Sequence, residues 1–318
     1  MEKTDENKQI YKLTYHGKGL DYFVIMVVNA ILTAVTLSIY YPWARAKELK
    51  YIYGSTSFNG DRFSFSGTGK EMFIGYLKTI LIFALMMAVY AGLFIAGYPV
   101  LSIVVLYAFL IAILPLALHG SYRYRMARTS WRGIRFGYRG DKKELIVGFL
   151  KWFFLTIITL GIYGAWMSVN LNNYIFGHIR AGNVEFKYRA KGSEYFWIFL
   201  KGYLLTIITL GIYSFWWYKD LFEFYVKNLS LEKDDKTITF RSRATAGDVF
   251  SLLLPNFLIT VFTLGLGLAW VETRNMKFTC DMIEMEGDID LDSLSQTEAD
   301  YADATGEEMS DFFDIDLI

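Results

Sequence analysis

Long runs of apolar residues, separated by shorter polar and aromatic stretches, set the pattern of this chain. A helix needs about 17 to 25 apolar residues to cross a hydrocarbon core of about 30 Å, because each residue adds about 1.5 Å. Two runs are separated only by Gly97 and Tyr98, so they predict a transmembrane helical hairpin. The runs that we expect to cross a membrane cover residues 20–41, 72–96, 99–118, 145–166, 196–217 and 249–270.

An internal repeat underlies these runs. The sequence LTIITLGIY occurs at residues 155–163 and again, without a change, at 205–213. A looser Thr-Leu-Gly-Ile-Tyr-x-x-Trp pattern can be read four times, starting at Thr36, Thr159, Thr209 and Thr263. An alternating, strand-like stretch precedes each copy at the same distance. This regularity predicts a repeated unit of strand, apolar segment, aromatic end and short amphipathic helix.

The expected fold is therefore a membrane all-α protein with about six transmembrane helices built from a repeated unit. Short β-hairpin-like amphipathic connections join the helices. Residues 1–10 form a polar N-terminal segment, residues 11–290 the membrane domain, and residues 291–318 a disordered acidic tail. The boundaries of the units lie near 11–60, 61–133, 134–183, 184–237 and 238–290.

The repeat also creates a conflict over membrane topology. Loops of similar sequence should prefer the same side, yet a unit with one crossing places successive loops on opposite sides. If the four repeated segments re-enter instead, every Lys and Arg of the connections lies on one side, which satisfies the positive-inside rule better. A re-entrant backbone in lipid, however, leaves unpaired N–H and C=O groups that cost several kcal/mol each. We therefore predict six crossings and leave the orientation open.

Charge is divided unevenly along the chain. The 32 Lys and Arg residues balance the 32 Asp and Glu residues, but residues 281–318 contain acidic side chains and no Lys or Arg. The body is consequently basic and suits anionic lipid headgroups. The acidic tail has the composition of a solvated segment, and its end, DFFDIDLI, offers a second interpretation as a docking sequence for basic loops or a partner.

One polar residue recurs at a matching depth in each apolar segment. Two interpretations remain open: the residues line a solute path between repeats, or they anchor the segments at the membrane interface by reaching the headgroups. The aromatic residues of the repeated motif are expected to be structural, at span ends and packing contacts. The polar set is Asn29, Lys78, Lys151, Lys201 and Asn256, and the aromatic set is Tyr40, Trp43, Tyr163, Trp166, Tyr213, Trp216 and Trp270.

Catalytic and metal-binding patterns are not recognisable. One Cys and three scattered His predict neither a disulfide framework nor a metal site. Paired carboxylates, a Ser-His arrangement and a phosphate-binding Gly loop are likewise not found, so we expect a protein without enzymatic activity or cofactor.

The segment TLSIYYPWARAKELKYIYGSTSFNGDRFSFSG (36–67), with its later copies, resembles the bacterial inner-membrane family of unknown function typified by YjgN. The resemblance covers residues 11–290 and implies a multi-pass protein of the bacterial cytoplasmic membrane. It carries over no activity and no catalytic residue.

Two classes of function are compatible with the sequence, and we expect the first, transport, with the second as the alternative. A transporter or channel-like permease is favoured by the repeat and by the polar series. A non-transporting envelope protein, which organises lipids or binds partners through its basic aromatic hairpins, is favoured by the scarcity of polar groups in the spans. We expect membrane lipids, anionic ones above all, as partners. A homo-oligomer is compatible with the sequence, a nucleic-acid partner is not expected, and no solute is indicated.

Overall fold

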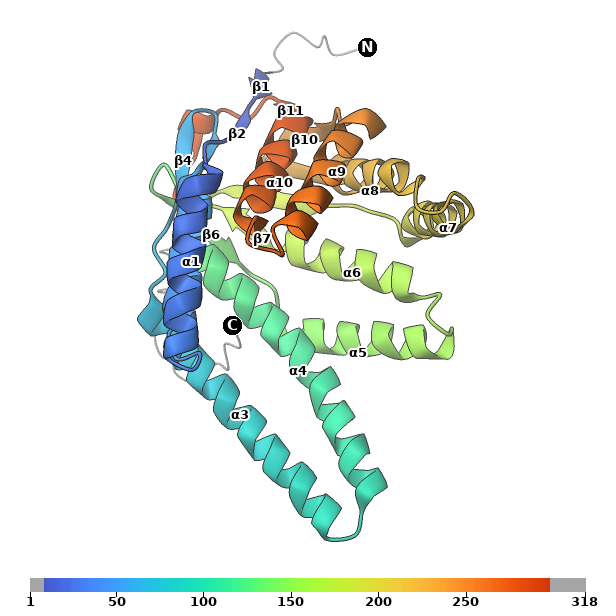
Figure 1. The fold of residues 1–318 in the computed structure, drawn as a ribbon. Helices are drawn as coiled ribbons and strands as arrows, with labels where there is room; N and C mark the ends of the chain where they lie inside the picture. Colours follow the sequence, from blue (N-terminus) through green and yellow to red (C-terminus); the bar gives the residue numbers. More distant parts are fainter. Residues whose placement is uncertain (1–8, 298–318) are drawn as a thin grey trace.

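The computed structural model of this 318-residue chain describes residues 9–297. A unit of strand, helix, helix and strand occurs five times in succession over this range (Figure 1). The first helices of the units are α1 Gly19–Val35, α3 Gly69–Ile95, α5 Lys142–Ile158, α7 Gly192–Ile208 and α9 Ala246–Phe262. The second helices are α2 Tyr41–Gly54, α4 Pro99–Ala127, α6 Gly164–Gly177, α8 Ser214–Lys227 and α10 Leu268–Met282.

The strands of all units join one antiparallel sheet. Its order is β1-β11-β10-β9-β8-β7-β6-β5-β4-β3-β2. The bounds are β1 Gln9–Tyr11, β2 Leu13–Tyr15, β3 Thr56–Phe58, β4 Asp61–Phe65, β5 Thr129–Trp131, β6 Ile134–Tyr138, β7 Ile179–Ala181, β8 Val184–Tyr188, β9 Leu229–Lys233, β10 Lys236–Ser242 and β11 Ile283–Gly287.

The sheet closes on itself through its first two strands. Only Lys12 separates β1 from β2, so the two are halves of one extended segment. The β1 half pairs with β11, and the β2 half pairs with β3. The result is a nearly closed ring with ten strand positions, and closure reduces the number of unpaired backbone groups that make open edges prone to aggregation.

All helical connections leave the ring at one edge. Tyr15 at the end of β2 lies opposite Thr56 at the start of β3, and Phe65 lies opposite Thr129 in the same way. The short turns between units lie at the other edge, as the pairing of Phe58 with Asp61 shows. Each helical pair is therefore a hairpin that starts and ends at one edge, called here the helix edge. The opposite edge is the turn edge.

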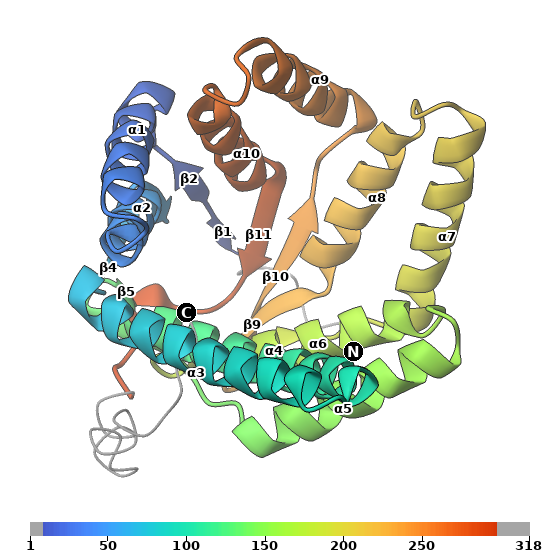
Figure 2. The same cartoon turned by 60° about the horizontal axis from the view of Figure 1, so that its bottom comes forward.

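The hairpins form a second ring around the strands (Figure 2). Each second helix packs on the first helix of the next unit and on its first strand, as α2 does with α3 and β4. The last helix, α10, packs on α1 and β2, so the helical ring also closes. Buried clusters at these junctions include Phe224 of α8 and Leu145 of α5, both at 0% exposure.

The expectation of an all-α fold with about six transmembrane helices is wrong. Among the described residues, two helices are long and apolar enough to cross a membrane, α3 with 27 residues and α4 with 29. The first helices of the other four pairs have 17 residues, about 25 Å in length. The apolar run 145–166 is in fact α5, a five-residue turn and the start of α6. The prediction failed because the turn is itself apolar and contains no Pro, so it continues the hydrophobic pattern of the helix.

Candidate functional site

The repeated Thr-Leu-Gly-Ile-Tyr motif forms the turn at the tip of each short helical hairpin. In the fourth unit, Thr209 Oγ1 donates to the Leu205 carbonyl (2.7 Å) and accepts from the Tyr213 N–H (2.9 Å). Leu210 and Gly211 have φ values of +51° and +96°, which reverse the chain. Gly is the residue that adopts the second of these conformations without strain.

This turn pairs its own backbone N–H groups. The N–H groups of Leu210, Gly211 and Ile212 donate to the carbonyls of Ile207, Thr206 and Thr209, at distances of 2.8 to 3.2 Å. The other three short hairpins repeat these bonds, with Gly267 in place of the Tyr in the last one. The N–H groups of these turns are therefore paired, which reduces the energetic objection to a re-entrant segment in lipid.

The tips present apolar side chains. The Leu of the motif is 94% exposed at positions 160 and 210, 93% at 264 and 87% at 37. The outward faces of the first helices continue this surface, for example through Val147, Phe154 and Ile158 of α5. Apolar surface this extensive is unusual on a protein surrounded by water and is typical of contact with lipid or a partner.

Three of the motif Trp residues join neighbouring units. Trp166 packs against Phe196 of the next unit (ring centroids 5.3 Å apart), and Gly192 leaves the room for it. Trp43 makes the same contact with Phe73 and Gly69, and Trp270 makes it with Phe23 and Gly19 across the closure of the ring. Trp216 is 46% exposed. The Tyr residues stack on the Trp three positions later, in the pairs Tyr40–Trp43, Tyr163–Trp166 and Tyr213–Trp216.

The polar series is distributed over all five hairpins. Asn29 is buried and donates to the Ala44 carbonyl of its own hairpin (3.1 Å). Asn256 is buried as well; it donates to Asn275 and accepts from Arg274 Nε, both at 2.8 Å and both on α10. The two Asn residues thus link the helices of single hairpins. Lys151 and Lys201 are exposed on first helices, and Lys78 is half-buried on α3.

The interior of the β ring, called here the lumen, is apolar and contains two cavities. Ten strand positions enclose more space than the eight that side chains can just fill. Two adjoining cavities, of about 220 Å³ and about 340 Å³, share the side chains of Leu13, Phe63, Phe136, Phe186 and Leu229. The smaller cavity reaches the turn edge, and the larger one reaches the helix edge.

The outer face of the β ring is polar and charged. Glu185 pairs with Arg180 (2.6 Å) and Lys187 (2.5 Å), and Arg189 pairs with Glu232 (2.7 Å). Hydrogen bonding from Lys187, opposed by slight burial and supported by Arg180, lowers the pKa of the Glu185 carboxyl. Such a surface is suited to water. The molecule therefore has a polar part, the outer face of the β ring, and an apolar part, the helical hairpins that extend from the helix edge.

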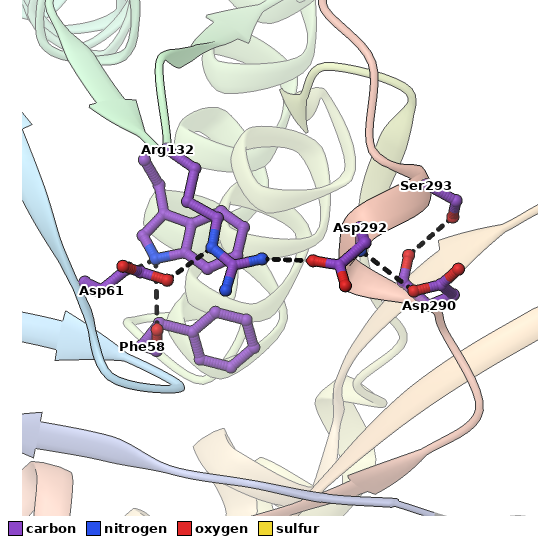
Figure 3. A network of polar contacts seen from close by, with 7 residues as sticks. Phe58, Asp61, Arg132, Asp290, Asp292 and Ser293 are labelled. Atoms are coloured by element: carbon purple, nitrogen blue, oxygen red, sulfur yellow. Dashed lines mark hydrogen bonds and ion pairs between the residues drawn. The ribbon is translucent and has the colours of Figure 1, made fainter.

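A segment following β11 covers the turn edge. Residues 288–297, called here the capping segment, contain the short helix η1 Leu291–Ser293. Arg132 donates to Asp61 on one side and to Asp292 on the other, where the distance is 2.7 Å (Figure 3). The Asn183 N–H donates to the Ser295 carbonyl (3.1 Å). A Cβ on Gly182 would lie 2.1 Å from that carbonyl oxygen, so the close approach requires glycine there.

The capping segment inserts apolar side chains into the lumen. Ile289 is 1% exposed, and Leu291 and Leu294 line the smaller cavity with it. Tyr11 donates its hydroxyl to the Ile289 carbonyl (2.5 Å). Burial, together with Asp288 and Asp290, raises the pKa of the Tyr11 hydroxyl above its ordinary value.

Part of the predicted acidic tail thus belongs to the folded structure. Residues 298–318, including the DFFDIDLI sequence, lie outside the described residues. The roles of Arg132 and the capping segment were not predicted, because the contact between Arg132 and Asp292 joins residues 160 positions apart and cannot be read from local patterns. The alternation of Ile134, Phe136 and Tyr138 did indicate one apolar strand face, and that face contributes to the lumen.

Comparison with known proteins gives a family but no activity. The chain is 29% identical over 171 residues to inner membrane protein YjgN of Salmonella typhimurium, which covers 50% of this chain and 42% of that protein. Proteins of the same name are 33% identical in Escherichia coli O157:H7 (48% of this chain, 36% of the relative) and 36% identical in strain K12 (42% and 32%). The alignments thus span less than half of the length of these relatives. No solved structure matches the chain significantly.

The family model described as "Bacterial protein of unknown function (DUF898)" matches residues 10–192, 183–234 and 217–312. These matches cover nearly the whole chain and confirm the resemblance drawn from the repeated motif. The chain belongs to this family of bacterial proteins of unknown function.

Proposed function

We propose that this protein is a non-transporting protein of the bacterial inner membrane that organises lipids. In this proposal the ring of helical hairpins lies in the bilayer and enters it from one face, while the β ring stands in water at that face. Among the described helices, only α3 and α4 are long enough to reach the far side.

The observation that carries the proposal is the common edge of the hairpins. Every helical pair starts and ends at the helix edge. The short hairpins end in turns with paired backbone N–H groups and with Leu side chains that are 87–94% exposed. A 17-residue helix of about 25 Å falls short of a hydrocarbon core of about 30 Å, so such a tip stays within the lipid.

The membrane and the orientation follow from two further arguments. The relatives carry the name inner membrane protein, which supports the same location here. With re-entrant hairpins, all Lys and Arg residues other than Lys78, Lys151 and Lys201 lie outside the apolar runs and on one side. The positive-inside rule then favours the cytoplasmic face for the β ring, where the basic body meets anionic headgroups.

Transport by a path through the repeats has less support. Asn29 and Asn256 use their amides to join helices within single hairpins. Lys151 and Lys201 lie on outward-facing first helices. An interfacial or packing role is the better proposal for these side chains.

The depth of a hairpin tip tests the proposal. In a Cys280→Ala background reconstituted in phosphatidylethanolamine and phosphatidylglycerol vesicles, a spin label is attached at Leu210→Cys, and another at Asn59→Cys serves as the aqueous control. We expect oxygen to relax the label at residue 210 and a water-soluble nickel complex to relax the label at residue 59. Equal access of nickel to both labels would mean that the tip is in water, which contradicts the proposal.

The second arm of the test concerns lipids. Spin-labelled phosphatidylglycerol should show a larger motionally restricted fraction next to the protein than spin-labelled phosphatidylcholine, because the body is basic. Equal restricted fractions would remove the preference for anionic lipid from the proposal.

A further inference from the structure

The lumen of the β ring has the properties of a ligand site. We propose that it binds one acyl chain of a membrane lipid, which enters from the helix edge. The inference deepens the proposed function and rests on it in one respect, because it needs lipid at the helix edge.

The chemistry of the lining restricts the ligand to an apolar one. The smaller cavity is lined entirely by aliphatic and aromatic residues together with Met285, among them Trp131, Val184 and Phe240. Trp131 has already committed its indole N–H to the Phe58 and Asp61 carbonyls, at 3.2 and 3.1 Å. A polar ligand would lose its hydrogen bonds with water and find no replacements there.

The shape of the lumen favours a chain over a bulky molecule. The cavity of about 220 Å³ is smaller than the roughly 300–1,000 Å³ of pockets that hold drug-sized ligands. The cavity of about 340 Å³ adjoins it, and side chains such as Phe136 and Phe186 line both cavities. An unbranched chain can fill the two cavities in succession, whereas a fused-ring molecule needs a single wide one.

The two ends of the lumen determine the direction of entry. At the turn edge, Ile289, Leu291 and Leu294 of the capping segment close the smaller cavity. At the helix edge, the larger cavity is bordered by Ile52 and Met126 from the ends of α2 and α4. The end that the capping segment does not cover therefore faces the side from which the apolar hairpins extend, and membrane lipid is the abundant apolar molecule there.

A photoactivatable fatty acid tests the inference directly. The full chain, purified in detergent, is mixed with palmitic acid that carries a diazirine at its methyl end, irradiated and digested, and the modified residues are located by mass spectrometry. We expect modification at lumen residues such as Phe136, Val184 and Leu231. Modification confined to outward residues of the hairpins, such as Phe154 and Phe257, would overturn the inference.

A matched pair of variants adds a second criterion. Ala181 lines the smaller cavity, so Ala181→Phe should fill part of it and reduce lumen modification about tenfold, the change expected for about 1.4 kcal/mol. Thr239 lies on β10 between Ile238 and Phe240 and faces outward, so Thr239→Phe should leave the modification unchanged. Equal modification in both variants would contradict the site. If Ala181→Phe does not fold, the positions of the modified residues in the chain without substitutions decide the question.

This experiment is independent of the proposed function because it needs no bilayer. A tip exposed to water combined with a modified lumen would refute the proposed membrane arrangement alone. A tip in lipid combined with an unmodified lumen would refute the acyl-chain site alone.

Discussion

Replacing Thr209 by Val should destabilise the protein by about 1–3 kcal/mol, the cost of one partly buried backbone donor left without a partner. Val keeps the shape of Thr and removes only the hydroxyl. The Leu205 carbonyl retains a bond from the Thr209 N–H (2.9 Å). The Tyr213 N–H has the hydroxyl as its partner at 2.9 Å and would be orphaned. The substitution removes both hydrogen bonds of the Thr209 hydroxyl but leaves only one backbone group, the Tyr213 N–H, without a partner.

The assay is reversible unfolding of the chain in bilayer nanodiscs, followed by tryptophan fluorescence. Thr239→Val is the matched control, because the Thr239 hydroxyl bonds the Glu286 carbonyl at an exposed position where water can replace it. We expect the control to change the free energy of unfolding by less than about 0.5 kcal/mol. An equally small change for Thr209→Val would refute the reasoning that the hydroxyl seals a turn placed in lipid.

Three further predictions address the ring and its cap. Gly182→Ala should displace the capping segment and raise hydrogen exchange in residues 288–297, whereas Gly133→Ala, also at a positive φ but with open space around it, should not; equal exchange in both would contradict the close approach. Phe224→Ala should cost about 3–5 kcal/mol in unfolding free energy, because the side chain is fully buried, and a loss below about 1 kcal/mol would refute the assigned packing. Hydrogen bonding from Lys187 lowers the pKa of Glu185 below its ordinary 4.5, so its contribution to stability should be complete above that pH and lost as the pH falls through the lowered pKa. Glu185→Gln should reduce this loss of unfolding free energy at acid pH by less than about 1 kcal/mol, as expected for a partly exposed pair. An unchanged loss in the variant would exclude the Glu185 carboxylate as its source.

Local features of this fold can be read from the sequence because they depend on neighbouring residues. The alternating stretches at 134–138 and 184–188 are strands β6 and β8, since alternation places one side of a strand toward an apolar interior. Among the helices of residues 9–297, α3 and α4 have transmembrane length. The family resemblance, drawn from the repeated motif, is confirmed.

Features that depend on distant residues could not be predicted in this way. The pairing of β1 with β11 and of β2 with β3, which closes the ring, joins segments far apart in the sequence. The nature of the repeated turn was obscured by its composition, because Leu210 and Ile212 extend the apolar run. The decisive detail, a Thr hydroxyl that caps the next helix, becomes visible only when the hydrogen bonds are known.

The lumen also lay beyond local patterns. Its lining comes from most strands of the ring, so no single segment shows it. Arg132 and Asp292, which hold the capping segment, are 160 positions apart.

The central claim is that every helical hairpin returns to the same face of the membrane, and cysteine labelling tests it most directly. Asn59→Cys in the turn after β3 and Lys191→Cys before α7 are both exposed, and each is introduced into a Cys280→Ala chain. A membrane-impermeant maleimide is applied to intact cells and to inverted membrane vesicles. We expect both cysteines to react from the same side, the inverted vesicles if the β ring is cytoplasmic. Reaction of residue 59 from one side and residue 191 from the other would show that the hairpins cross the membrane and would contradict the account.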